Sequence, residues 1–208
     1  MPDVTSIVFV VDDDILVRES LEILISTAGW QPETFQSAEE FLCRPRTTVP
    51  CCLVLEATLQ GLNGLELQKQ LTERSEMPII FIAGNGDVRM TVQAMKAGAV
   101  EFLTKPFKDD VLLDAIRNAI ERSRATLRRD SELRRLRGCY LSLTRREREV
   151  MALVVDGLLN KQVGGELGIS EITVKAHRGQ VMRKMNADSL PDLVTMSARL
   201  GLRSTAKA

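Results

Sequence analysis

The chain has 208 residues, of which 44% are hydrophobic and 27% charged, and its 28 Lys and Arg balance 28 Asp and Glu. This length suits two domains, and the composition is that of a globular protein. No apolar run approaches the ~18 residues of a membrane span, so we expect no membrane partner. The N-terminus resembles no targeting signal, and the four cysteines lack metal-ligand or disulfide spacing, so we expect a cytoplasmic protein.

The two halves of the chain have opposite charge. Residues 1–107 carry 8 Lys and Arg against 15 Asp and Glu, a net of −7, whereas residues 108–208 carry 20 against 13, a net of +7. This asymmetry predicts an acidic regulatory or metal-binding module joined to a module that meets a polyanion. The alternative is two solvated surfaces of different charge.

Short apolar runs alternate with amphipathic segments throughout the first half. The predicted strands are 7–11, 32–35, 52–55, 78–83 and 100–104, and the predicted helices are 15–28, 37–43, 64–74 and 87–97. Three of the strands are continuous hydrophobic runs, which is typical of a parallel sheet covered on both faces. The alternation predicts an α/β fold with a doubly wound, five-stranded parallel sheet.

Charged residues follow the predicted strands where ligands bind to such a sheet, at its carboxyl edge. Asp12, Asp13 and Asp14 follow the first strand, Glu56 ends the third, and Lys105 follows the fifth. Clustered carboxylates favour a bound cation, and oxygen ligands suit Mg²⁺. A lysine suits an anionic oxygen beside the metal. The alternative for such an acidic run is helix capping, which we expect for Asp14.

The segments "VVDDD", "SAEEFL" and "QAMKAGAVEFLTKPF" make residues 5–120 similar to the receiver domain of two-component response regulators. The resemblance implies that Asp12, Asp13 and the Thr58 carbonyl bind Mg²⁺ and that Lys105 contacts the phosphoryl group. It also implies that Phe102 is the aromatic switch residue and that the peptide bond before Pro106 is cis.

The chain departs from the receiver pattern at three positions. Glu56 stands where the family has the phosphoryl-accepting Asp, Ala83 replaces the switch Thr or Ser, and Gln60 replaces a Pro. A misplacement of about 1 Å can cost about a hundredfold in rate, so we expect impaired phosphorylation. Two interpretations stay open: Glu56 mimics a phosphoryl group by reaching Lys105, or the switch has decayed.

A helical segment without Pro or Gly connects the halves. It runs from Lys108 to about Arg137, with Gly138 expected to end it, and its part 121–137 is an Arg-rich extension of the last receiver helix. The alternative for this extension is a frayed, solvated linker. The predicted parts of the chain up to this point are a receiver domain at 1–121 and a helical linker at 122–139, followed by a second domain at 140–208.

The second half is helical in pattern. Four helices are predicted: from a capping box at Thr144 and Glu147 to about Asp156, from Asn160 to Leu167, from a cap at Ser170 to about Met185, and from Asp188 or Ser189 to about 200. The second and third of these are joined by a tight turn at Gly168, as in a helix-turn-helix.

The third of these helices has a basic outer face, which favours insertion into the major groove of DNA. We expect four inward residues and five outward ones: Val174, His177, Val181 and Met185 inward, and Glu171, Lys175, Arg178, Gly179 and Met182 outward. Because no metal ligand or nucleophile accompanies His177, we interpret it as structural.

The segments "LTRREREV", "GLLNKQV" and "ELGISEITVKAHRGQVMRKM" make residues 140–203 similar to LuxR-type DNA-binding domains. The resemblance implies base contacts at Lys175, Ala176 and Gly179, and backbone contacts at Lys161, Ser170, Thr173 and Lys184. The basic face adds Arg178 and Arg183 as DNA-binding candidates. The last helix, 189–200, matches the one used for dimerisation, and Gly164-Gly165 stands where the family usually has Ala.

Together the halves resemble a response regulator of the NarL/FixJ type. We therefore predict a transcription regulator, not an enzyme, that binds double-stranded DNA as a homodimer and has a sensor histidine kinase as a possible partner. The alternatives are a conventional phosphorelay regulator, a metal-dependent phosphohydrolase, and an interaction scaffold that no longer reads DNA.

Overall fold

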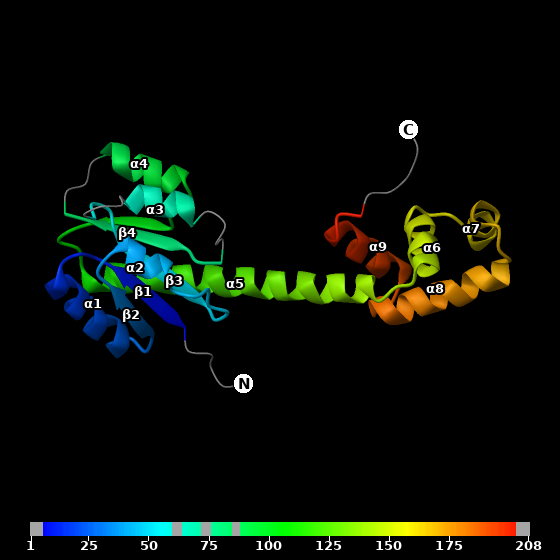
Figure 1. The fold of residues 1–208 in the computed structure, drawn as a ribbon, viewed down its shortest axis with the longest axis horizontal. Coiled ribbons are helices and arrows are strands. Elements are labelled where there is room, and N and C mark those ends of the chain that lie inside the picture. The colour runs from blue at the N-terminus through cyan, green and yellow to red at the C-terminus, as the bar shows by residue number, and fades with distance from the viewer. Residues whose placement is uncertain (1–5, 60–63, 72–75, 85–87, 203–208) are drawn as a thin grey trace. The chain divides into compact units, whose positions relative to one another are not determined.

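The computed structural model describes residues 6–59, 64–71, 76–84 and 88–202 (Figure 1). Its contacts divide the chain into two compact units, Met1–Arg128 and Arg129–Ala208. Each unit has its own core, so each is described separately.

The first unit is built on a five-stranded parallel sheet, which confirms the predicted fold class. Its strands are β1 (Ile7–Val11), β2 (Gln31–Phe35), β3 (Cys51–Glu56), β4 (Ile79–Ala83) and β5 (Glu101–Thr104), in the order β2-β1-β3-β4-β5. Each predicted strand end lies within one residue of the observed end, because the strands are short apolar runs with clear polar or glycine boundaries.

Helices cover both faces of this sheet (Figure 1). They are α1 (Ile15–Thr27), α2 (Ala38–Leu42), α3 (Gly64–Gln70), α4 (Val88–Lys96) and the start of α5 (Asp109–Leu141). Alternate strand residues enter two cores: Phe9 and Leu53 pack with α2, α3 and α4, whereas Val8 and Val54 pack with α1 and α5. The last predicted residues of α3 and the first of α4 include positions outside the described residues.

Helix α5 extends through Gly138 to Leu141, so the prediction that Gly138 ends it was wrong. A glycine inside a helix costs about 1 kcal/mol relative to Ala. Leu136, Cys139 and Tyr140 pack in a core of the second unit on either side of Gly138, and this burial offsets the cost. The alternative of a frayed linker is also wrong for this segment.

The second unit contains four further helices, α6 (Arg145–Val155), α7 (Asn160–Leu167), α8 (Glu171–Met185) and α9 (Leu190–Arg199). The predicted caps are confirmed: Thr144 and Glu147 form a capping box, and the hydroxyls of Ser170 and Ser189 accept N–H groups of α8 and α9. Gly168 turns the chain between α7 and α8 with φ of 65°. None of the helices within the described ranges is long and apolar enough to span a bilayer.

The adjacent glycines of α7 have different environments. A Cβ on Gly164 would lie 2.8 Å from the carbonyl oxygen of Ile169, whereas a Cβ on Gly165 would meet nothing within 4 Å. Gly164 therefore permits the close approach of the turn before α8. Gly165 has no such packing reason and only weakens the helix.

We predict that Gly165→Ala stabilises the second unit by about 1 kcal/mol, because alanine removes the backbone-entropy cost and meets open space. The matched control, Gly164→Ala, should gain less, since its methyl group must displace the Ile169 carbonyl. Thermal and denaturant unfolding of the full chain measure both changes. An equal or larger gain for Gly164→Ala would contradict the assigned role of Gly164.

Candidate functional site

The carboxyl edge of the sheet brings three charged residues of the first unit together. Asp12 directly follows β1, Glu56 ends β3, and Lys105 directly follows β5. The Lys105 Nζ lies 3.0 Å from Asp12 Oδ2 and 2.6 Å from Glu56 Oε2. Asp12 and Glu56 are only 1% and 5% exposed. The predicted convergence of strand-end charges is therefore observed for these three residues.

The remaining carboxylate oxygens in this cluster also accept hydrogen bonds. The Asp14 N–H donates to Asp12 Oδ1 at 2.9 Å. The Thr58 N–H and hydroxyl donate to Glu56 Oε1 at 3.3 Å and 3.0 Å. Glu56 is thus held at both oxygens, by Thr58 on one side and Lys105 on the other. Buried carboxylates require such partners.

Burial and ion pairing shift the pKa values of two of these groups. Burial raises the pKa of Asp12, and the hydrogen bonds from Asp14 and Lys105 only partly offset this effect. Burial opposes the charge on Lys105, but hydrogen bonds to Glu56 and Asp12 outweigh it and raise the lysine pKa. The cluster holds two acidic side chains and one ammonium, so a further cation would favour ionised Asp12.

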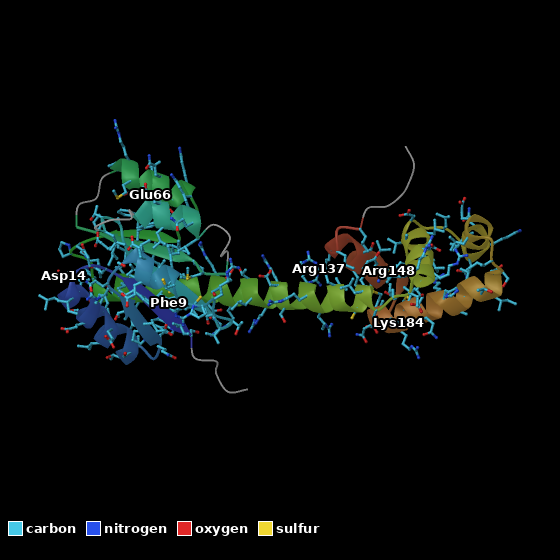
Figure 2. The ribbon with its side chains drawn as sticks, viewed as in Figure 1. Phe9, Asp14, Glu66, Arg137, Arg148 and Lys184 are labelled. Atoms are coloured by element: carbon cyan, nitrogen blue, oxygen red, sulfur yellow. The ribbon has the colours of Figure 1, made fainter. Side chains whose placement is uncertain are left out.

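Other predicted residues lie outside this charged triad. Asp13 is exposed, and Asp14 accepts the Leu16 N–H at 2.9 Å as the N-cap of α1, which confirms the capping role expected for Asp14 (Figure 2). Ala83 is fully buried at the end of β4. Phe102 is half-buried and stacks on Phe81, with ring centroids 6.0 Å apart. The Lys105-Pro106 peptide bond is cis, as the resemblance implied. No group of three or more metal-binding side chains comes together among the described residues.

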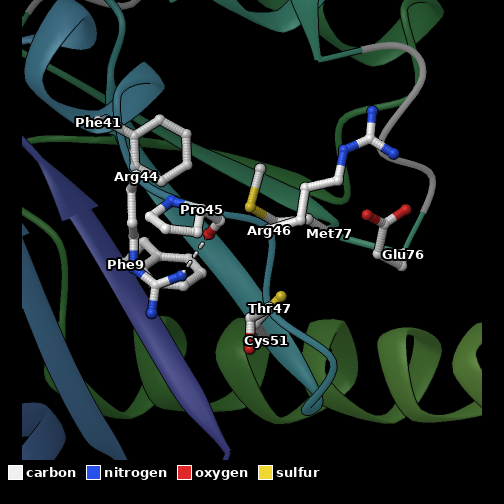
Figure 3. Close-up of a pocket in the computed structure, with 9 residues that line it drawn as sticks. All are labelled: Phe9, Phe41, Arg44, Pro45, Arg46, Thr47, Cys51, Glu76 and Met77. Atoms are coloured by element: carbon white, nitrogen blue, oxygen red, sulfur yellow. Dashed lines mark hydrogen bonds between the residues drawn. The ribbon is translucent and has the colours of Figure 1, made fainter.

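Arg44 lines a small cavity elsewhere in this unit. Arg44 lies over the Phe9 ring at 4.3 Å and donates to the Pro45 carbonyl at 3.0 Å (Figure 3). It also forms a bidentate pair with Glu33. The cavity beside it holds about 10 Å³, which is room for about one water molecule.

In the second unit, α7, the Gly168 turn and α8 form the predicted helix-turn-helix. The inward face of α8 is confirmed, since Val174, Val181 and Met185 are at most 1% exposed and His177 is half-buried. The outward face is confirmed at Glu171, Lys175 and Gly179. The prediction was wrong for Met182, which is half-buried against a core, because it lies beside that inward face.

The predicted DNA contacts differ in their surroundings. The exposed ones are Lys161, Ser170, Lys175, Ala176, Gly179 and Arg183. Arg178 and Thr173 are half-buried, and Arg178 donates to Asn160 Oδ1 at 3.3 Å. Lys175 pairs with Glu171 at 3.1 Å on the surface of α8. Surface pairs of this kind are weak and exchange readily for a stronger anion.

Lys184 lies near the end of α8 and takes part in a largely buried ion pair (Figure 2). Its Nζ lies 2.7 Å and 3.0 Å from the two carboxylate oxygens of Glu147, which is 5% exposed. Glu147 Oε2 also accepts the Thr144 N–H at 2.7 Å. The pair connects the start of α6 to α8, a role that the sequence did not reveal because the two residues are far apart along the chain.

Comparison with known proteins agrees with both parts of this structure. Residues 8–117 match the response regulator receiver domain, and residues 141–197 match bacterial regulatory proteins of the luxR family. Nodulation protein W of Bradyrhizobium diazoefficiens is 50% identical, over 95% of this chain and 87% of the relative. Response regulator protein TodT of Pseudomonas putida F1 is 45% identical, over 96% and 88%.

Solved structures show the same relationship. The response regulator StyR superposes with a TM-score of 0.84 at 46% identity, over 94% of this chain and 99% of that one. Full-length FixJ from B. japonicum gives a TM-score of 0.54 at 37% identity, over 95% and 98%. The chain belongs to the response regulators of the NarL/FixJ type, with a receiver domain followed by a LuxR-type DNA-binding domain. It is a transcription regulator.

We predict that Glu147→Gln destabilises the second unit by on the order of 3 kcal/mol at pH 7, because it leaves the Lys184 charge unpaired. The hydrogen bond from Lys184 lowers the pKa of Glu147 below its ordinary 4.5. The stabilisation is therefore present above about pH 4.5 and lost as pH falls below it.

Denaturant unfolding of the wild type and Glu147→Gln at pH 7 and pH 4 measures this dependence. The difference in unfolding free energy between the two proteins should shrink toward the lower pH. The double variant Glu147→Gln with Lys184→Met serves as control and should recover part of the loss. A difference that does not change with pH would contradict the assignment.

Proposed function

We propose that this regulator binds double-stranded DNA as a homodimer through the exposed face of α8, and that phosphorylation of residue 56 is not its ordinary input. The observation that carries the DNA-binding proposal is the contrast between the two faces of α8. Val174, Val181 and Met185 are buried on one face, and Lys175 and Arg183 are exposed on the other. Cations on the second helix of a helix-turn-helix suit the major groove.

The proposed backbone contacts surround this face. Lys161 is exposed in the first turn of α7, and Ser170 caps α8, where free N–H groups and the helix dipole favour a phosphate. Ala176 and Gly179 are exposed and small, which permits close approach to base edges. Arg178 and Thr173 are proposed as half-buried contributors. We propose Lys184 primarily as the support of α8, with any phosphate contact secondary to its pair with Glu147.

Homodimer formation on DNA is proposed through α9. Its outer face carries small or apolar residues at helical spacing, namely Pro191, Val194, Thr195 and Ala198, all exposed. A second copy would bury this stripe and place two α8 helices on paired half-sites. A DNA-bound regulator of this kind acts in the cytoplasm.

The proposed loss of ordinary phosphorylation rests on Glu56 and Ala83. Glu56 is one methylene longer than Asp and spans from Thr58 to Lys105 with both of its oxygens engaged. Its carboxylate therefore occupies the space in front of Lys105 where a transferred phosphoryl group would bind. Ala83 offers no hydroxyl to such a group. The receiver resemblance implies a sensor kinase as partner, and we propose that any such kinase does not act through Glu56 in the ordinary way.

Mg²⁺ is proposed as a ligand of the first unit rather than a requirement for DNA binding. Asp12, Asp13 and the Thr58 carbonyl provide oxygen donors of the kind that Mg²⁺ prefers, and the raised pKa of Asp12 reflects a buried acid that a cation would favour in its ionised form. The metal would neutralise anionic oxygens at this edge of the sheet. We propose no enzymatic turnover, since Asp12 and Glu56 are both tied to Lys105.

We predict that Lys175→Ala and Lys161→Ala weaken DNA binding in different ways. Lys175→Ala should cost about 1–3 kcal/mol and relax the base preference at one position of each half-site. Lys161→Ala should weaken binding equally for all sequences. It should also reduce the slope of log affinity against log salt concentration by about 1, as expected for the loss of one phosphate contact. Fluorescence anisotropy at several salt concentrations, on sites selected from a random library, measures both. Unchanged binding in both variants would contradict DNA binding through α7 and α8.

We predict that acetyl phosphate with Mg²⁺ phosphorylates Glu56→Asp about a hundredfold faster than the wild type, because the shorter side chain restores the acceptor position. Adding Ala83→Thr should couple phosphorylation to tighter DNA binding. Intact-protein mass spectrometry and anisotropy give the two readouts. Stable wild-type phosphorylation that changes DNA affinity would refute the proposal.

A matched variant separates the two interpretations of Glu56. Glu56→Gln keeps the size of the side chain and removes its charge. If Glu56 mimics a phosphoryl group, Glu56→Gln lowers dimerisation and DNA affinity. If the switch has decayed, Glu56→Gln leaves both unchanged.

A further inference from the structure

Ile172, in the first turn of α8, is 80% exposed. Within α8, all of which the structure describes, it is the one large apolar side chain that is exposed. The two valines of the helix, Val174 and Val181, are 0% and 1% exposed. An isolated exposed isoleucine on a surface is ordinary, so its position on the helix decides whether it has a function.

Ile172 lies on the same face of α8 as the proposed DNA contacts. At 3.6 residues per turn, Ala176, Gly179 and Arg183 lie within about 40° of Ile172 around the helix, and Lys175 lies about 60° away. All of these residues are exposed. The centre of the buried face, near Val181, is on the opposite side, about 180° away. Ile172 is therefore the N-terminal member of the stripe that faces the DNA.

The residues that follow Ile172 on this stripe are small. Ala176 carries only a methyl group, and a Cβ on Gly179 would meet nothing within 4 Å. The backbone of α8 can therefore approach base edges closely at its middle, with Ile172 projecting at its N-terminal end. In a helix-turn-helix, it is the N-terminal residues of the second helix that contact base edges.

We propose that Ile172 determines specificity by packing against the 5-methyl group of a thymine in the major groove. The C5-methyl of thymine is the apolar feature that the groove offers, whereas the other base-edge groups are hydrogen-bond donors and acceptors. An aliphatic side chain gains from contact with this methyl group and leaves polar edges unsatisfied. Lys175 on the neighbouring turn suits a guanine, so each half-site contains a thymine close to the base read by Lys175.

The inference rests on the proposed DNA-reading role of α8, and the experiment separates the two. Sites are first selected from a random double-stranded library with the full-length protein. In the selected site, each thymine of one half-site is then replaced by uracil, which removes only the methyl group. Affinities are measured for the wild type, Ile172→Ala, Lys175→Ala and the control Ile23→Ala, whose residue is 69% exposed on α1 of the first unit.

One thymine-to-uracil replacement should weaken wild-type binding by about fourfold, the factor that corresponds to burial of one methyl group. Ile172→Ala should bind the thymine site more weakly and show no further loss at that uracil. Ile23→Ala should keep the wild-type response to uracil. The melting temperature of Ile172→Ala should match the wild type because the side chain is exposed.

Two other results have separate meanings. If the wild type selects a site and Lys175→Ala loses affinity for it, but Ile172→Ala responds to every uracil as the wild type does, the role of Ile172 is overturned and DNA reading by α8 stands. If no site is enriched and Lys175→Ala binds as the wild type does, both the proposed function and this inference fail.

Discussion

A parallel sheet buried on both faces leaves only its strand ends for polar chemistry, and this constraint organises the first unit. The apolar residues of β1, β3 and β4 enter one of two hydrophobic cores, so Asp12, Glu56 and Lys105 gather at the ends of β1, β3 and β5. Isolated carboxylates at such depth would be costly. The shared ammonium of Lys105 stabilises them, and the same geometry forms the pocket in which a receiver would exchange phosphate.

In the second unit, one face of α8 packs against the core and the opposite face is exposed. The inward face of α8 packs through Val174, Val181 and Met185, and its flank is held by the ion pair of Lys184 with Glu147. The opposite face of α8 therefore does not pack against the core. Small residues are tolerated at Ala176 and Gly179 because the fold does not need side chains there, although a glycine within a helix costs about 1 kcal/mol.

Much of this architecture could be predicted from local patterns. The strand limits, the capping box at Thr144 and the helix-turn-helix followed from apolar runs, caps and glycines, because each is decided by neighbouring residues. The errors arose where distant contacts outweigh local preference. Gly138 predicted a helix end, but packing of Cys139 and Tyr140 continues the helix.

Contacts between side chains that are far apart in the sequence could not be predicted from local patterns either. Lys184 resembles a phosphate contact in sequence, and only the fold reveals that Glu147 binds it. The sequence places Ile172 out of phase with the buried positions of α8. Its exposure, however, depends on how α6 and α7 cover the helix, which no short pattern specifies.

Glutamate at residue 56 affects two properties of the pocket differently, namely its net charge and the position of the acceptor carboxylate. Glu56 uses its extra methylene to contact Thr58 and Lys105 at once, so the acceptor carboxylate is fixed by two neighbours. The cluster still has one more acid than base, and burial still raises the pKa of Asp12. The net charge of the pocket is the same with an aspartate or a glutamate at residue 56. Under the proposed function, the pocket would attract Mg²⁺ with either acid at residue 56, since attraction depends on charge, whereas phosphoryl transfer depends on the position of a single oxygen.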